Sequence, residues 1–129
     1  MGRRISESEA VVDHIIGPGP LALHGRYRFT PDLAWQHQQI AERHHATGGR
    51  STYLGDWHSH PAAHNGALSW LDTQARQKII QAPEAQCERP LMAIFWGTPK
   101  AWTLTVWQAR LRPRRLLGPK VELQKCQVA

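Results

Sequence analysis

YLGDWHSHPAAHNGALSWLD, residues 53–72, joins a strand pattern to the start of a helix. On a strand, successive side chains point to opposite faces, so His58 and His60 share one face and Ser59 lies on the other. Neutral imidazoles at this spacing can both reach one metal ion at about 2.0–2.1 Å. Asp72, one turn into the following helix, can supply a third ligand. Two histidines, one aspartate and a water form the open tetrahedral arrangement typical of catalytic zinc.

The same stretch also has a purely structural interpretation. Ser69-x-x-Asp72 ahead of an apolar run is a helix-capping pattern, in which Ser69 caps the helix and Asp72 interacts favourably with its dipole. Two histidines on a strand can simply be hydrogen-bonded within the protein. However, both histidines, the proline that follows them and the Ser/Asp pair fall within one short window, and this combination favours the metal site. A capping role for Ser69 is compatible with it.

The segments around this stretch alternate between strand and helix patterns. A helix is predicted to begin at Thr30-Pro31-Asp32, where Thr30 can cap it and Pro31 suits its first turn, and to end at Thr47-Gly48-Gly49. A second helix is predicted from Ser69 to about Gln81. The predicted strands are Ala10–Ile16, His24–Phe29, Tyr53–Ser59, Leu91–Trp96 and Trp102–Gln108, the last two separated by the turn-like GTPKA. This order predicts a mixed α/β fold in a single domain.

Length, composition and charge indicate which class of protein the chain belongs to. A length of 129 residues, a hydrophobic fraction of 41% and six tryptophans favour one packed globular domain. The formal net charge is +6, and much of the excess lies in RLRPRRLLGPK, which we assign to a solvated basic tail, residues 110–129. Cys87 and Cys126 are too few for a disulfide framework, and no signal peptide or long apolar run is present. A reduced cytoplasmic protein without a membrane segment is therefore expected.

GDWHSHP followed by SWLD resembles the core of the JAMM, or MPN-plus, family of zinc isopeptidases, which reads His-x-His-Pro, a short loop, then Ser-x-x-Asp. Three flanking segments resemble the bacterial branch of this family, found in integrative elements and ubiquitin-like operons: GPGP, TPDLAWQHQQI and AIFWGTPKAWTLTVW. The resemblance covers most of residues 2–109. A JAMM-like domain over residues 1–109, followed by the basic tail, is the organisation that it implies.

The resemblance implies a cytidine-deaminase-like fold, with a mixed sheet flanked by helices. It also implies zinc-dependent cleavage of a peptide or isopeptide bond at the tail of a ubiquitin-like protein, its conjugate or its precursor. His58, His60 and Asp72 match the Zn²⁺ ligands of the family. Ser69 matches the serine whose hydroxyl orients the water and stabilises the oxyanion. A further partner protein is compatible with this activity.

Two features depart from the family pattern. The loop AAHNGAL, Ala62–Leu68, is longer than usual, a change that a loop absorbs at small entropic cost. The family's general base is a glutamate in a Glu-x-Gly-Gly context on an early strand after an opening helix. Neither is found, so the chain is expected to lack the family's first helix and strand. Glu7 and Glu9 are the candidates near the start, and neither is followed by glycines.

A missing general base would cost about 10²- to 10⁴-fold in rate. The alternative function is therefore a catalytically inactive scaffold of the same fold that binds a ubiquitin-like protein or another protein partner. Nucleic-acid binding through the basic tail fits less well, because no aromatic residues are interleaved with its charges. The zinc-dependent nucleobase deaminases fit poorly as well, because the chain has no His-x-Glu with a later Pro-Cys-x-x-Cys.

Overall fold

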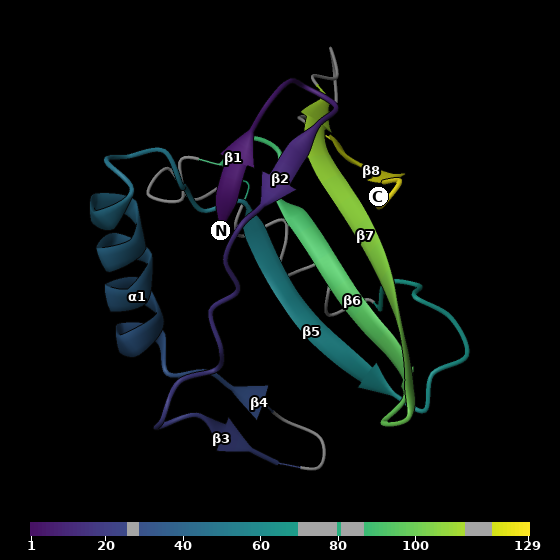
Figure 1. The fold of residues 1–129 in the computed structure, drawn as a ribbon. Helices are drawn as coiled ribbons and strands as arrows, with labels where there is room; N and C mark the ends of the chain where they lie inside the picture. Colours follow the sequence, from purple (N-terminus) through teal and green to yellow (C-terminus); the bar gives the residue numbers. More distant parts are fainter. Residues whose placement is uncertain (26–28, 70–79, 81–86, 113–119) are drawn as a thin grey trace. The chain divides into compact units, whose positions relative to one another are not determined.

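A computed structural model describes the chain except for residues 26–28, 70–79, 81–86 and 113–119 (Figure 1). It divides into two compact units, Met1–Leu54 and Gly55–Ala129, which are described separately below. The predicted mixed α/β class is confirmed, since a helix and a mixed sheet are both present. Within the described residues, no helix is long and apolar enough to cross a membrane. The predicted helix over residues 69–81 lies almost entirely outside the described residues.

The second unit is built on a four-stranded sheet with the order β5-β6-β7-β8 (Figure 1). Its strands are listed here in chain order: β5 (Gly55–Pro61), β6 (Leu91–Thr98), β7 (Ala101–Arg112) and β8 (Lys120–Lys125). The β5–β6 pair is parallel, and the other two pairs are antiparallel. All three strands that the sequence predicted in this unit are present, each with slightly different ends.

One face of this sheet, which we call the histidine face, carries both motif histidines. His58 pairs with Ile94 and His60 with Trp96, and cross-strand partners point to the same side of a sheet. The same face contains the buried side chains of the unit: Met92, Ile94, Thr105 and Ala109, which are between 0% and 5% exposed. The opposite face carries exposed apolar side chains, including Trp57, Trp102 and Leu104. The histidines therefore sit at the edge of the packed side of the sheet.

The β6–β7 hairpin closes the sheet at the end where the histidines lie. Thr98 pairs with Ala101, so Pro99 and Lys100 form the turn that the GTPKA segment predicted. Gly97 has a φ of 122°, which side chains rarely adopt, and a Cβ there would lie 2.3 Å from the Ala101 carbonyl oxygen. Glycine at this position permits the tight approach of the two strands.

The basic segment is in part sheet. The predicted boundary at residue 109 falls inside β7, which continues to Arg112, and β8 pairs with β7 beyond it. The physical reason is the alternation in KVELQK: Val121 and Leu123 lie opposite Leu111 and Ala109, on the histidine face. The density of charged residues in this segment conceals that period-two pattern in the sequence.

The first unit contains two short antiparallel pairs and one helix. Strand β1 (Gly2–Arg4) pairs with β2 (Ala10–Val12), and β3 (Leu23–His24) pairs with β4 (Phe29–Thr30). The predicted strand over residues 10–16 is thus shorter than expected. Residues predicted as one strand from His24 to Phe29 instead contribute to two paired strands.

The cap of helix α1 (Leu33–Ala46) lies two residues later than predicted. Asp32 caps it, because its Oδ1 accepts a hydrogen bond from the backbone N–H of Trp35 at 3.2 Å. Thr30, the predicted cap, is instead paired with Leu23 in the sheet. The helix ends at Thr47, followed by Gly48 and Gly49 in the left-handed region, as predicted.

Asp13 links the segment after β2 to the helix and to Ser51. Its Oδ1 accepts hydrogen bonds from Ser51 Oγ at 2.9 Å and from Arg43 Nη2 at 3.3 Å. These donors, first the Ser51 hydroxyl and then Arg43, hold the pKa of the Asp13 carboxyl below its ordinary value of 3.8. Because the pKa is lowered on folding, the charged carboxylate stabilises the fold above pH 3.8, and this contribution is lost as the pH falls through the lowered pKa.

We therefore expect Asp13→Asn to unfold at a lower urea concentration than the parent at pH 7, with the difference shrinking as the pH falls below 3.8 and through the lowered pKa. The change keeps a carbonyl oxygen as an acceptor for Ser51 and replaces the charged carboxylate with a neutral amide. Urea unfolding at a series of pH values measures this difference. Glu9→Gln, which removes a charge from the exposed β1–β2 loop, should follow the parent throughout. A difference for Asp13→Asn that is the same at every pH would contradict the role of its charge.

Candidate metal centre

Strand β5 brings the two motif histidines together. His58 Nε2 lies 2.9 Å from His60 Nε2, and the ring centroids are 4.7 Å apart. Both side chains are half-buried on the histidine face, whereas Ser59 between them is exposed on the other face. The alternation of the strand, continued to Pro61, produces this pairing as the sequence predicted.

The convergence of the two Nε2 atoms suits a shared metal ion. Two nitrogen ligands of a tetrahedral zinc ion lie roughly 3.3 Å apart when each bond is about 2.0–2.1 Å. The 2.9 Å separation is also a hydrogen-bond distance, in which one imidazole N–H donates to the other ring nitrogen. A small rotation of either ring would convert that hydrogen bond into a pair of metal ligands. The donor set and its spacing therefore fit a zinc or similar transition-metal ion.

The other predicted site residues lie beyond the loop that follows β5. Ser69 is exposed and is the last described residue before the gap. Asp72, the predicted third ligand, falls outside the described residues. Within the part of the chain that the structure describes, no third His, Cys, Asp or Glu joins His58 and His60 to form a cluster. The structure thus contains two of the three predicted ligands as a pair.

The loop from Ala62 to Leu68 is hydrogen-bonded to the sheet at two points, Ala62 and Gly66. Ala62 has a φ of 61°, and its N–H donates to the Gly97 carbonyl oxygen at 2.7 Å. Further along, the indole N–H of Trp107 donates to the Gly66 carbonyl oxygen at 2.9 Å. Because Trp107 lies opposite Met92, its side chain belongs to the histidine face. The loop that leads to Ser69 is therefore held against the same face as the histidines.

Gly66 is buried at the point where this loop meets the sheet. A Cβ at this position would lie 2.3 Å from Thr105 Oγ1 and 2.7 Å from Trp96 Cδ1. These two side chains are themselves joined, since Trp96 Nε1 donates to Thr105 Oγ1 at 2.9 Å. The strand patterns around Trp96 and Trp107 did not predict that these side chains hold the loop. The Asn65-Gly66 dipeptide is a turn signal, and it indicated a tight turn at the point where the loop contacts the sheet.

The other candidate residues either make separate contacts or are exposed. Trp57 makes an edge-to-face contact with Phe95, with ring centroids 5.9 Å apart, on the opposite face of the sheet. His64 is exposed in the loop. Glu7 and Glu9 belong to the first unit, where both are exposed in the loop joining β1 and β2. Neither glutamate lies on a strand.

Comparison with known proteins adds independent information. Residues 2–109 match the family model described as prokaryotic homologues of the JAB domain. The chain is also 39% identical over 123 residues to the "Probable metalloprotease y4qB" of Sinorhizobium fredii (strain NBRC 101917 / NGR234). That alignment covers 95% of this chain and 74% of the relative. No solved structure matches the chain significantly.

Proposed function

Because the chain belongs to the family of prokaryotic JAB-domain homologues, we propose that it is a zinc-dependent metallopeptidase. His58, His60 and Asp72 are the proposed zinc ligands, and Ser69 is the proposed catalytic hydroxyl. The observation that carries the proposal is the convergence of two imidazole Nε2 atoms, 2.9 Å apart, at the end of a strand. The likeness to a relative named as a probable metalloprotease supports the same class of reaction.

The chain's own residues would have distinct roles in this reaction. A zinc ion bound there would lower the pKa of a coordinated water toward about 7 and polarise the scissile carbonyl. His58 and His60 would supply neutral nitrogen donors from a rigid strand, which keeps their positions constant. The Ser69 hydroxyl would donate a hydrogen bond to the carbonyl oxygen as its negative charge develops, an interaction that is strongest in the transition state. The Trp107–Gly66 hydrogen bond would hold the loop that carries this serine.

The proposed substrate is the tail of a ubiquitin-like protein, as a conjugate or a precursor, and the proposed setting is the cytoplasm. The family resemblance of the His-x-His-Pro and Ser-x-x-Asp motifs supports this substrate class. An isopeptide or peptide bond at such a tail is an amide, the bond that the proposed metal chemistry hydrolyses.

An inactive scaffold that binds a ubiquitin-like or other protein is the second candidate function. The observation that favours it is the position of Glu7 and Glu9, exposed in a loop rather than on a strand. Without a group that accepts the proton of the attacking water, cleavage would slow by about 10²- to 10⁴-fold. A scaffold of this kind would still bind the metal through its histidines.

The test of the proposed function is cleavage of a ubiquitin-like protein that carries a C-terminal peptide extension. We expect the purified protein to release the extension, to stop when treated with a zinc chelator, and to recover when zinc is restored. Ser69→Ala should keep its zinc and cleave about 10²- to 10³-fold more slowly, because one hydrogen-bond donor to the oxyanion is lost.

Ser59→Ala is the matched control, since this serine lies on the same strand as the histidines but on the opposite face. It should cleave at the parental rate. Zinc binding without cleavage by the parent would favour the scaffold. Equal rates for Ser69→Ala and the parent would remove Ser69 from the mechanism.

A further inference from the structure

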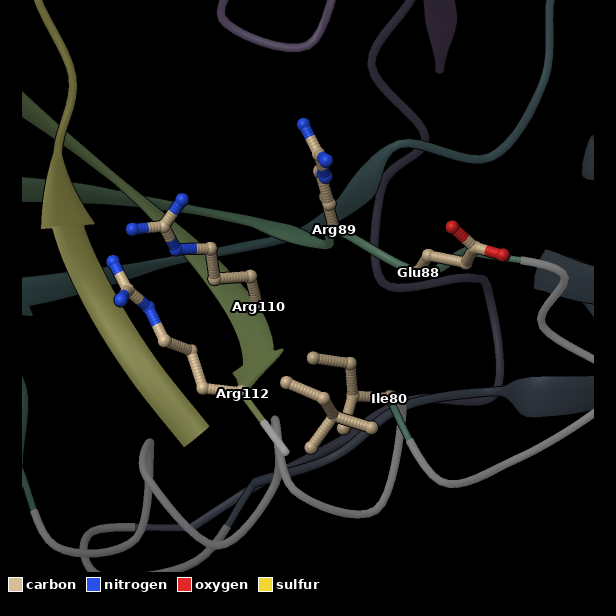
Figure 2. Close-up of a pocket in the computed structure, with 6 residues that line it drawn as sticks. Ile80, Glu88, Arg89, Arg110 and Arg112 are labelled. Carbon is tan, nitrogen blue, oxygen red and sulfur yellow. The ribbon is translucent and has the colours of Figure 1, made fainter. Parts of the chain in front are cut away.

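A concave site lies at the end of β7 that is distant from the histidine pair, in the second unit. It is a hollow of about 440 Å³, and three of the residues that line it are arginines. Figure 2 shows its lining, which comprises Ile80, Glu88, Arg89, Arg110, Leu111 and Arg112. None of these residues has a role in the proposed peptidase reaction, so a ligand in this hollow would serve a different function.

The register of the sheet separates this hollow from the histidine pair. His60 pairs with Trp96, near the end of β6, whereas Leu91 at the start of β6 pairs with Gln108. These two levels are five residues apart along β6, which corresponds to roughly 17 Å along the strand. Arg110 and Arg112 also point away from the histidine face, because side chains alternate along β7. The two sites are therefore distinct.

The fold itself brings the arginines together. The Ala109 N–H donates to the Pro90 carbonyl oxygen at 3.0 Å, which continues the β6–β7 pairing beyond Leu91. That register places Arg89 beside Arg110, and Arg112 follows two residues later on the same face of β7. Like charges directly opposite each other destabilise a sheet. Such a grouping is favourable when an anion lies among the guanidinium groups.

One carboxylate partly neutralises this group. Glu122 Oε2 of β8 forms an ion pair with Arg112 Nε at 2.6 Å and accepts a hydrogen bond from Arg110 Nη2 at 3.4 Å. Within the described residues, it is the acidic side chain that forms an ion pair with either arginine. A guanidinium has five N–H donors, so a single shared carboxylate leaves most of the donors of both arginines for other acceptors. In Figure 2 the Glu88 carboxylate is directed away from Arg110 and Arg112.

We propose that this hollow binds a small ligand through a phosphate group. The planar fork of a guanidinium matches the oxygens of a phosphate in pairs, which favours this anion over a spherical one. The volume of the hollow falls within the range of small-molecule sites. The side chains of Arg110 and Arg112 are 43% and 57% exposed, so a ligand can reach them from solvent. This proposal is independent of the metallopeptidase function.

Titration calorimetry with pyrophosphate tests the proposal, at a salt concentration of about 50 mM to limit screening. We expect saturable binding of one pyrophosphate per chain. The double variant Arg110→Gln/Arg112→Gln should bind about tenfold or more weakly, because two charge-assisted contacts are lost. Lys100→Gln is the matched control: it removes a cation from the β6–β7 turn, at the other end of the sheet, and should bind like the parent.

Glu122→Gln should change the affinity for pyrophosphate in the opposite direction. It removes the competing carboxylate while keeping the shape of the side chain, so pyrophosphate should bind several-fold more tightly. This variant decides the question if the double variant does not fold by circular dichroism. Unsaturable binding by the parent, equal weakening in Lys100→Gln, or weaker binding in Glu122→Gln would overturn the proposal. Binding of an oligonucleotide or an acidic peptide through these arginines, with none of pyrophosphate, would also overturn it.

Discussion

His60→Ala should purify with less than a tenth of the zinc of the parent protein. His58 and His60 present their Nε2 atoms 2.9 Å apart, and a metal ion held by both would lose one of its few protein ligands in the variant. Changing a group that merely supports a zinc ligand costs about 10–100-fold in metal affinity, and loss of the ligand itself should cost at least as much. Elemental analysis of the purified proteins, followed by competition with a chromophoric chelator, measures the content and the affinity.

The control for this experiment is His64→Ala. His64 is exposed in the loop close to the motif, so its replacement removes a nearby imidazole without changing the pair on β5. The parent and His64→Ala should both contain about one zinc per chain, as expected of a single site with a water in its open position. Equal zinc in His60→Ala and the parent would exclude these histidines as ligands. If the parent protein contained no zinc, the metallopeptidase proposal would be rejected. The chain would then be a scaffold that keeps the motif residues without a metal.

Gly66→Ala should unfold at a markedly lower temperature and urea concentration than the parent. The new methyl group would lie 2.3 Å from Thr105 Oγ1 and 2.7 Å from Trp96 Cδ1. Neither side chain can easily move, because they are hydrogen-bonded to each other and Thr105 is only 5% exposed. Inserting a methyl group into such a packed site costs about 1–3 kcal/mol, and more when the surroundings cannot relax. Displacement of the loop should also weaken the Trp107–Gly66 hydrogen bond.

Gly17→Ala is the matched control for this substitution. A Cβ at Gly17 would meet no atom within 4 Å, and its backbone does not require glycine, so the stability should change little. Urea unfolding followed by tryptophan fluorescence gives the free energy of unfolding of each variant. If Gly66→Ala were as stable as Gly17→Ala, the loop would not be packed on Trp96 and Thr105.

Local patterns predicted the elements better than they predicted their ends. The helix end at Thr47 and the turn at Pro99-Lys100 were predicted correctly, since each depends on neighbouring residues alone. The helix start was placed too early, at Thr30, because pairing with Leu23 takes that residue into a strand and leaves Asp32 as the cap. Strand β8 was missed, because its alternation is carried by two apolar residues among charged ones.

The sequence by itself determined the pairing of His58 with His60, because side chains two apart on a strand must share a face. It also determined the family, through motifs that are contiguous in the chain. Only the tertiary structure decided which side chains hold the loop toward Ser69, since Trp107 and Gly66 are 41 residues apart. It likewise decided that Arg89 and Arg110 line one hollow. Both contacts depend on the register between strands, which arises from packing of the whole sheet and is not encoded in the spacing of neighbouring residues.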